Sequence, residues 1–252
     1  MFIDSHAHYN ASAFEEDRDA LLSSFPENGI DIVVNIGDDI PESENSLRLA
    51  EKYPFIYAAV GVHPEHALMV DDAALQKLEE LAGHEKAVAI GEIGLDYYYD
   101  DVPRNIQKEV FRRQLKLAKK LSMPVVIHDR EAHGDCLSIL KEEGITSGVM
   151  HCFSGSAEFM REVTKLGLYV ALGGVVTYKN ARHTVDVARE VPIDKLLLET
   201  DCPYLSPVPL RGKRNSSLNL IYTAEKIAEL RGMTTEEVAQ ITAENTKRLF
   251  GI

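Results

Sequence analysis

The chain has 252 residues, of which 45% are hydrophobic, enough for the core of one large globular domain. Its 27 lysines and arginines stand against 40 aspartates and glutamates, so the net charge of −13 argues against nucleic-acid binding through an overall basic surface. With no apolar run of about 18 residues, no expected leader and three scattered cysteines without a CxxC motif, we predict a reduced, cytoplasmic protein that does not enter a membrane.

Apolar, β-branched segments recur along the chain at long and fairly even spacing. We predict strands at 2–9, 30–37, 55–63, 87–96, 124–130, 148–155, 168–174 and 195–205. Near-continuous apolar runs such as "IDIVV" and "KLLL" are typical of parallel strands that are covered on both faces.

Helical patterns fill most of the gaps between these strands. We predict helices at 15–25, 43–53, 73–83, 104–121, 217–231 and 234–249. The clearest is 104–121, where Ile106, Val110, Leu117 and Leu121 form one apolar stripe and most charges lie opposite it. The last helix begins in "MTTEEVAQ", which has the threonine and glutamate of a capping box.

The alternation of strands and helices predicts an α/β fold with a parallel sheet. Eight repeats in about 250 residues favour a (β/α)8 TIM barrel that occupies residues 1–252 as a single domain. A doubly wound open sheet is the second choice, and it is disfavoured because no G-x-G-x-x-G turn follows the first strand and no P-loop is present.

Histidines and carboxylates stand at the ends of the predicted strands. They are His6 and His8, His63, Glu92, His128, His151 and Asp201. In a (β/α)8 barrel the carboxyl ends of the strands form one active face, so we expect these side chains to converge there. Any one of them could be an ordinary hydrogen-bonded residue, but the whole set is hard to explain by chance.

Even without His63, the four histidines and two carboxylates exceed the needs of one tetrahedral metal site. They suit two divalent cations with one carboxylate between them, a pair that activates water and stabilises a displacement at phosphorus. Mixed nitrogen and oxygen ligands indicate Zn, Mn, Fe or Mg rather than Ca or Cu(I).

Several segments resemble the TatD family of metal-dependent deoxyribonucleases, which belongs to the amidohydrolase-like barrels. The matching segments, in order along the chain, are "DSHAH", "GVHPE", "GEIGLDYYYD", "QKEVFRRQLKLAKKLSMPVVIHDREA", "HCFSG", "ETDCPYL" and "RGKRN". The chain departs from the family after "RGKRN", where Ser216 and Ser217 stand in place of the usual Glu-Pro pair.

The resemblance implies a metal-dependent hydrolase of the TIM-barrel type that cleaves phosphodiester bonds of DNA, with 3′-to-5′ exonuclease activity on single-stranded ends as the expected reaction. It assigns one metal to His6, His8, Glu92 and Asp201, and a second metal to Glu92, His128 and His151. Glu92 would bridge the two cations, which could be Mg, Mn or Zn, and Asp201 would accept a proton from the attacking water. No obligate protein partner is indicated.

Substrate contacts are less well defined by the sequence. Candidates are His63, Arg130 and, in the "RGKRN" loop, Arg211 and Asn215, because arginine binds phosphate bidentately. A solvated loop or a structural ion pair is an alternative for each arginine, and a structural hydrogen bond is one for His63. The tyrosines at 97–99 could stack on bases or simply pack.

Two further expectations concern residues beside the proposed ligands. Strand alternation predicts that Cys152 and Cys202 point away from the metals and pack under helices. Asp4, Asp96 and Glu199 could orient the histidines.

The sequence is also compatible with a second function. The same ligand set could serve an amidohydrolase-type enzyme that hydrolyses a C–N or C–O bond of a small molecule. The cationic loop and the presence of Glu92, rather than a lysine, at the bridging position favour the phosphodiester substrate.

Overall fold

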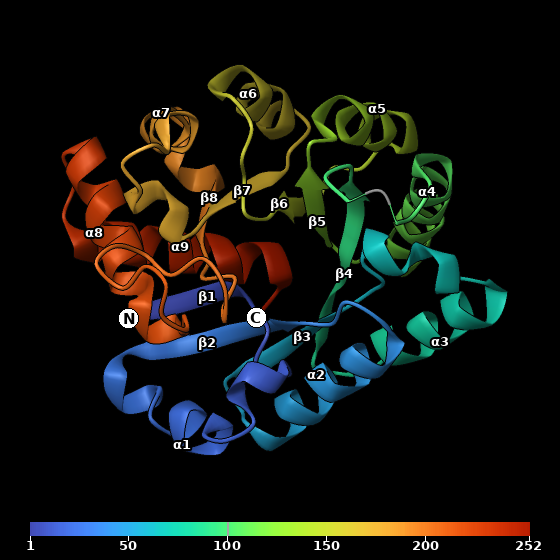
Figure 1. Ribbon diagram of the computed structural model, residues 1–252, viewed down its shortest axis with the longest axis horizontal. Helices are drawn as coiled ribbons and strands as arrows, with labels where there is room; N and C mark the ends of the chain where they lie inside the picture. Colours follow the sequence, from blue (N-terminus) through green and yellow to red (C-terminus); the bar gives the residue numbers. More distant parts are fainter. Residues whose placement is uncertain (100) are drawn as a thin grey trace.

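The computed structural model describes residues 1–99 and 101–252, so Asp100, the last residue of "GEIGLDYYYD", lies outside the described residues. Among the described residues, eight parallel strands follow one another around a sheet in chain order (Figure 1). The strands are β1 (Phe2–Ala7), β2 (Ile30–Ile36), β3 (Ile56–Val60), β4 (Ala87–Asp96), β5 (Val125–Arg130), β6 (Gly148–Met150), β7 (Tyr169–Leu172) and β8 (Leu196–Leu198). The predicted (β/α)8 barrel is confirmed.

The barrel closes between the first strand and the segment that follows β8. An isolated parallel bridge joins Ala7 to Cys202, and the Asp201 amide donates to the His6 carbonyl at 3.0 Å. The His8 amide donates in turn to the Cys202 carbonyl at 2.8 Å. The closure therefore brings the "HAH" segment directly beside Asp201.

Helices surround the strands and cover their outer faces (Figure 1). They are α1 (Arg18–Ser23), α2 (Ile40–Lys52), α3 (Asp72–Ala82), α4 (Arg104–Leu121), α5 (His133–Glu143), α6 (Ala157–Lys165), α7 (Arg182–Glu190), α8 (Leu220–Arg231) and α9 (Thr235–Phe250). The predicted bounds of α4 are confirmed, and so is the capping box, which Thr234 and Glu237 form at the start of α9. No helix in the described part of the chain is long and apolar enough to cross a membrane.

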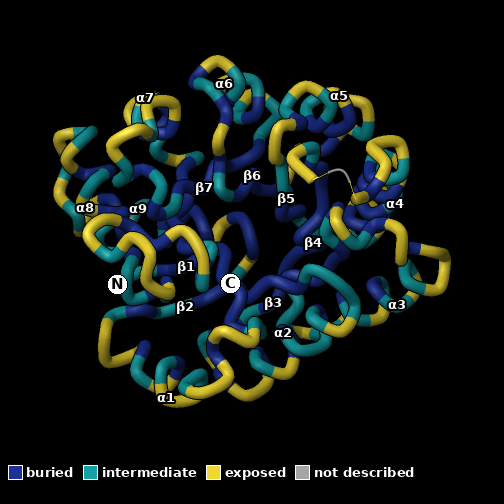
Figure 2. Tube along the Cα trace, viewed as in Figure 1, coloured by how far each residue is buried: buried dark blue, intermediate teal, exposed yellow. Residues whose placement is uncertain are grey.

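Two apolar clusters divide the core. The larger cluster lies between the strands and the helices, whereas the smaller one draws on β2 to β8 together with Leu249 and Phe250 of α9. Only the interior of the barrel can bring so many strands into one cluster. Phe250, Gly251 and Ile252 line a cavity with the first residues of β4 and the residues preceding β5, so the end of α9 covers the amino end of the barrel. Figure 2 shows the dark, buried strands at the centre and the exposed outer loops in yellow.

The interior changes from apolar to polar along each strand. Val126, Val149 and Leu197 point into the apolar interior cluster. Two residues further on, within β5 or directly after β6 and β8, the chain has His128, His151 and Glu199. The period of two therefore directs these three polar side chains into the carboxyl end of the barrel.

Candidate metal centre

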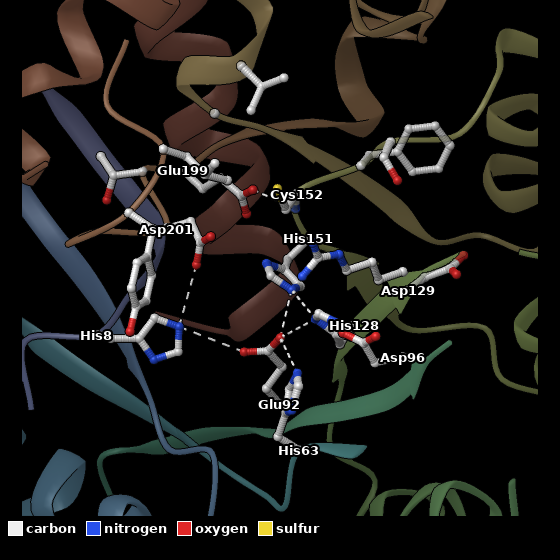
Figure 3. Close-up of a pocket in the computed structure, with 18 of the residues that line it drawn as sticks. His8, His63, Glu92, Asp96, His128, Asp129, His151, Cys152, Glu199 and Asp201 are labelled. Atoms are coloured by element: carbon white, nitrogen blue, oxygen red, sulfur yellow. Dashed lines mark hydrogen bonds and ion pairs between the residues drawn. The ribbon is translucent and has the colours of Figure 1, made fainter. Parts of the chain in front are cut away.

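Glu92 on β4 occupies the middle of a cluster of imidazoles at the carboxyl end of the barrel (Figure 3). Its Oε1 lies 2.7 Å from His151 Nε2 and 2.8 Å from His128 Nδ1. Its Oε2 lies 3.3 Å from His6 Nε2 and 3.8 Å from His8 Nε2. Each carboxylate oxygen therefore faces a different pair of histidines.

Asp201 completes the half of the cluster that contains the "HAH" segment. Its Oδ1 lies 3.5 Å from His8 Nε2 and 3.6 Å from His6 Nε2. These contacts follow from the barrel closure, which pairs the backbone of Asp201 with that of His6. The structure thus brings all six sequence-predicted ligands into one cluster.

The nitrogen atoms approach one another so closely that a cation would fit the arrangement. His6 Nε2 is 3.0 Å from His8 Nε2, and His128 Nδ1 is 3.2 Å from His151 Nε2. Each pair can share one proton in an N–H···N hydrogen bond, or both lone pairs can bind one cation, because two ligands of a tetrahedral metal lie about 3.3 Å apart. The geometry of His6, His8 and Glu92 suits a metal ion, as does that of His63, Glu92 and His128. Imidazole and carboxylate ligands together suit Zn, Fe, Mn or Mg.

The backbones of β4 and β5, which carry two of these ligands, lie unusually close together at Gly94. Gly94 has a φ of +152°, and a Cβ at this position would collide with the carbonyl oxygen of His128. The glycine therefore allows β4 to carry Glu92 up to the strand that carries His128.

Carboxylates outside the cluster hold its histidines. Asp96 Oδ2 lies 3.0 Å from His128 Nε2, the ring nitrogen that faces away from Glu92. Such a carboxylate sets the tautomer and the orientation of a metal-binding histidine. Asp4, in contrast, accepts hydrogen bonds from the hydroxyls of Thr200 and Ser217 and ties β1 to the segments that follow β8.

Glu199 lies behind two of the histidines. Its Oε1 accepts the Cys152 amide at 2.5 Å, whereas its Oε2 is buried and has no hydrogen-bond partner among the described residues. The Nδ1 atoms of His6 and His151 are buried and unpartnered in the same way, and ligand atoms of these three residues lie within 4.8 Å of one another. His6 and His151 stack with ring centres 3.9 Å apart. Glu199 therefore lies near both imidazoles, but it makes no hydrogen bond to either ring among the described residues.

The carboxylates control the charge of the histidines. Burial opposes protonation of His8, but its contact with Asp201 and the charge of Glu92 outweigh this effect and raise the pKa of His8 to about 9. Burial is likewise outweighed at His128, where Asp96 and Glu92 raise the pKa to about 10. Burial and the neighbouring His151 instead lower the pKa of His6 to about 4. Glu92 itself is buried, but the surrounding histidines hold its pKa well below the usual range.

A cavity of about 630 Å³ opens above the cluster. His63 and Arg130, two of the predicted substrate contacts, line it. His63 caps the short helix at Pro64–Met69, with Nδ1 accepting the Glu65 amide, and its Nε2 lies 3.7 Å from Glu92 Oε1. Burial lowers the pKa of His63 to about 3, so the ring is neutral and carries its proton on Nε2.

The other two predicted substrate contacts do not line this cavity. The Arg211 guanidinium lies 4.5 Å from the centre of the Tyr178 ring. Asn215 is fully buried, where its side-chain amide donates to the Thr200 carbonyl and its Oδ1 accepts the Ser216 amide. Asn215 therefore holds the loop in place, and Arg214 of the same loop pairs with Asp17 at 2.6 Å.

The prediction that Cys152 packs under a helix is wrong, because this residue lines the cavity. Strand β6 ends at Met150, and Cys152 has a φ of +43°, so the two-residue alternation no longer applies there. Cys202 is fully buried. Sequence reasoning also overlooked Asp38 and Glu65, which line the cavity after β2 and β3. The sequence did not single out these two residues, because acidic residues are common throughout this chain.

Comparisons with known proteins agree with this architecture. Residues 3–251 match the family described as TatD related DNase. The chain is 48% identical to the uncharacterized metal-dependent hydrolase YabD of Bacillus subtilis, with all of both chains covered. It is 37% identical to the uncharacterized metal-dependent hydrolase YcfH of Escherichia coli, covering 100% of this chain and 96% of that protein.

A solved structure gives the same result in three dimensions. The TatD homolog YjjV of Escherichia coli superposes with a TM-score of 0.94 at 34% identity, covering 100% of this chain and 98% of the other. The chain belongs to the TatD family of metal-dependent hydrolases.

Proposed function

We propose that the protein is a deoxyribonuclease that uses two divalent cations to remove nucleotides from the 3′ end of single-stranded DNA. The observation that carries this proposal is the position of Glu92, whose two oxygens face two separate pairs of histidines. In this proposal His6, His8 and Asp201 share one cation with Glu92, whereas His128 and His151 share the other. The cations are Mg, Mn or Zn.

When bound, such a pair of cations lowers the pKa of water and offsets the charge that develops on the phosphate. The protein's own groups have separate tasks. Asp201 accepts the proton of the attacking water at a carboxylate oxygen. Although burial alone would raise its pKa, the contact with His8 holds the pKa of Asp201 below the usual range, so the group is ionised at neutral pH. Arg130 supplies a positive charge at the cavity wall that can hold a phosphate oxygen.

The family description, TatD related DNase, supports DNA as the substrate. A second candidate is hydrolysis of a C–N or C–O bond in a small molecule. The lining of the cavity favours this alternative, because Arg130 is the single lysine or arginine among seven carboxylates that line it within the described residues. The substrate test must therefore include both classes.

The experiment uses single-stranded DNA labelled at its 5′ end, incubated with the purified protein and Mg or Mn. We expect a ladder of products that shortens from the 3′ end, and we expect EDTA to abolish it. The Asp201→Asn variant should lose the activity, whereas Asp186→Asn, which removes an exposed carboxylate of α7, should keep it.

Two outcomes would contradict the proposal. Full activity of Asp201→Asn would exclude this residue as the proton acceptor. If the protein binds metal yet leaves every DNA substrate intact, and instead hydrolyses members of a panel of amides and esters, the second candidate is correct.

A further inference from the structure

The large apolar side chains that the protein exposes are concentrated on one face. Among the described residues they are Leu68, Met69, Tyr98, Tyr99, Tyr204, Leu205 and Val208, apart from the terminal Met1. They lie in the segments that follow β3, β4 and β8, which emerge at the carboxyl ends of the strands, where the metal centre lies. Exposed apolar residues gathered in this way mark a binding surface rather than ordinary scatter. Tyr99, Tyr204 and Leu205 line the cavity itself.

One wall of this rim is an assembly of Arg130, Tyr98 and Tyr99. The guanidinium of Arg130 lies 3.8 Å from the centre of the Tyr98 ring and 5.2 Å from that of Tyr99. The two rings meet edge to face at 4.9 Å. Asp96 Oδ1 accepts the backbone amides of both tyrosines, while its Oδ2 contacts His128. The same carboxylate therefore fixes this aromatic wall relative to the metal centre.

The second wall stands beside the other half of the cluster. The Tyr204 amide donates to the Asp201 carbonyl at 2.9 Å, and the Tyr204 ring centre is 6.4 Å from that of His8. The Tyr204 side chain is 59% exposed and Leu205 is 37% exposed, although both line the cavity. In Figure 3, His8 and Asp201 lie on one side of Glu92 and His128 and Asp96 on the other, so the two walls flank the centre.

The charges of the cavity limit what these walls can bind. Asp38, Glu65 and Asp129 line it together with four carboxylates of the centre and its surroundings, and Arg130 is the only cationic side chain of the described lining that is permanently charged. Outside the cavity, Arg214 pairs with Asp17 and Lys108 pairs with Asp135 at 2.6 Å. The described lining of the cavity thus provides no continuous row of cations for a chain of phosphates. Stacking of bases on aromatic rings supplies affinity without such a row.

We propose that the rim is a base-stacking subsite, in which Tyr98, Tyr99 and Arg130 form one wall and Tyr204 and Leu205 form the other. It holds the bases of the last nucleotides of a single strand while their phosphate lies at the metal centre. The enzyme then recognises a strand end through its bases and not through a long run of phosphates. This inference rests on the proposed nuclease function, whose substrate it specifies.

The test compares two single-stranded substrates, one with normal bases and one with abasic residues at its last two 3′ positions. Stacking of one base predicts that Tyr99→Ala and Tyr204→Ala each raise KM for the normal substrate by about 5- to 150-fold, with a smaller effect on kcat. Tyr99→Phe and Tyr204→Phe should restore most of the affinity, because a phenyl ring stacks as well. With the abasic substrate, the ratio of wild-type to alanine-variant KM should approach one.

Two further readouts test the same subsite. Met69→Ala is the matched control, since Met69 is also an exposed apolar residue on the same face but does not line the cavity. It should behave as the wild type does on both substrates. The logarithm of KM should also depend weakly on the logarithm of salt concentration, with a slope near that of one or two phosphates, about 0.7 to 1.4.

The outcomes separate the two proposals. If the wild-type protein cleaves DNA and the tyrosine variants lose affinity equally for both substrates, or not at all, the stacking subsite is overturned and the nuclease function stands. A steep salt dependence would also overturn it, because it would indicate a phosphate track. If the wild type cleaves neither DNA, the nuclease function fails and the subsite fails with it.

Discussion

The two ends of the barrel interior are built from the same strand faces but differ in chemistry. Val149 lies in the apolar interior cluster, and His151, two residues later, lies beside Glu92. Leu197 of β8 and Glu199, which follows that strand, are related in the same way. The amino end buries side chains that need no partners, whereas the carboxyl end buries groups that do.

This difference separates the part of the barrel that stabilises the fold from the part that binds metal and substrate. Burial of apolar side chains at the amino end stabilises the fold and makes the barrel rigid. At the carboxyl end, buried polar atoms of His6, His151 and Glu199 lack hydrogen bonds within the described chain, which weakens the fold locally. We therefore expect changes at the amino end to affect stability and changes at the carboxyl end to affect metal binding and activity.

The largest effect should come from Glu92→Gln. An amide cannot replace a charged oxygen toward both pairs of histidines, so we expect hydrolysis to fall at least about 1,000-fold, more than the loss of an outer partner would cost. Metal content by elemental analysis and activity should be measured together, with Glu158→Gln on the surface of α6 as the control. Retention of full metal content and activity would show that Glu92 is not the centre of the site.

Phe250→Ala tests the opposite end. Phe250 is 6% exposed and packs in the apolar interior cluster, and removing such a side chain costs about 3–5 kcal/mol of unfolding free energy. Urea unfolding should reveal this loss, whereas the number of metal ions bound per folded protein should not change. Phe250→Leu should lose less. A change in the number of metal ions bound by the folded alanine variant would show that the amino end also affects metal binding.

Glu199→Gln should act on the metal centre without touching it. The new amide would place an N–H group where the unpartnered Oε2 lies, near His6 and His151, and so disturb the position of these rings. We expect metal affinity to fall by about 10- to 100-fold, measured by calorimetric titration, with a changed pattern of imidazole nitrogen signals in NMR spectra. Unchanged affinity together with unchanged spectra would mean that Glu199 only holds the Cys152 amide.

The smallest effect concerns His133, at the start of α5. Its hydrogen bond to Asp129 Oδ2 at 2.8 Å raises the pKa of His133 above its ordinary value of 6.5. The protonated ring therefore stabilises the fold below pH 6.5, and this contribution disappears as the pH rises through the higher pKa of the folded state. Because the side chain is 37% exposed, we expect only about 0.5 kcal/mol after screening by solvent.

The measurement compares unfolding of the wild type and His133→Gln at pH 6 and pH 9. The stability difference should be larger at pH 6. An equal difference at both values would show that packing against Phe159, and not charge, is the contribution of His133.

Much of this molecule could be read from local pattern. The number and order of the strands, the bounds of α4 and the capping box of α9 follow from periods of two and 3.6 residues and from end signals, which neighbouring residues determine among themselves. The strands predicted at 148–155 and 195–205 are shorter in the structure, where β6 ends at Met150 and β8 at Leu198. The convergence of His6, Glu92, His128 and Asp201 follows as well, because parallel strands of a barrel all end on one face.

The tertiary structure alone decided what lies beyond the strand ends. Cys152 enters the cavity because the backbone turns after β6, and Asn215 is withdrawn from it because Thr200 binds its side chain from 15 residues away. Glu199 lies behind both His6 and His151 because β8 closes the barrel against β1. Loops and closures have no period, so the positions of their side chains depend on partners that are distant along the chain.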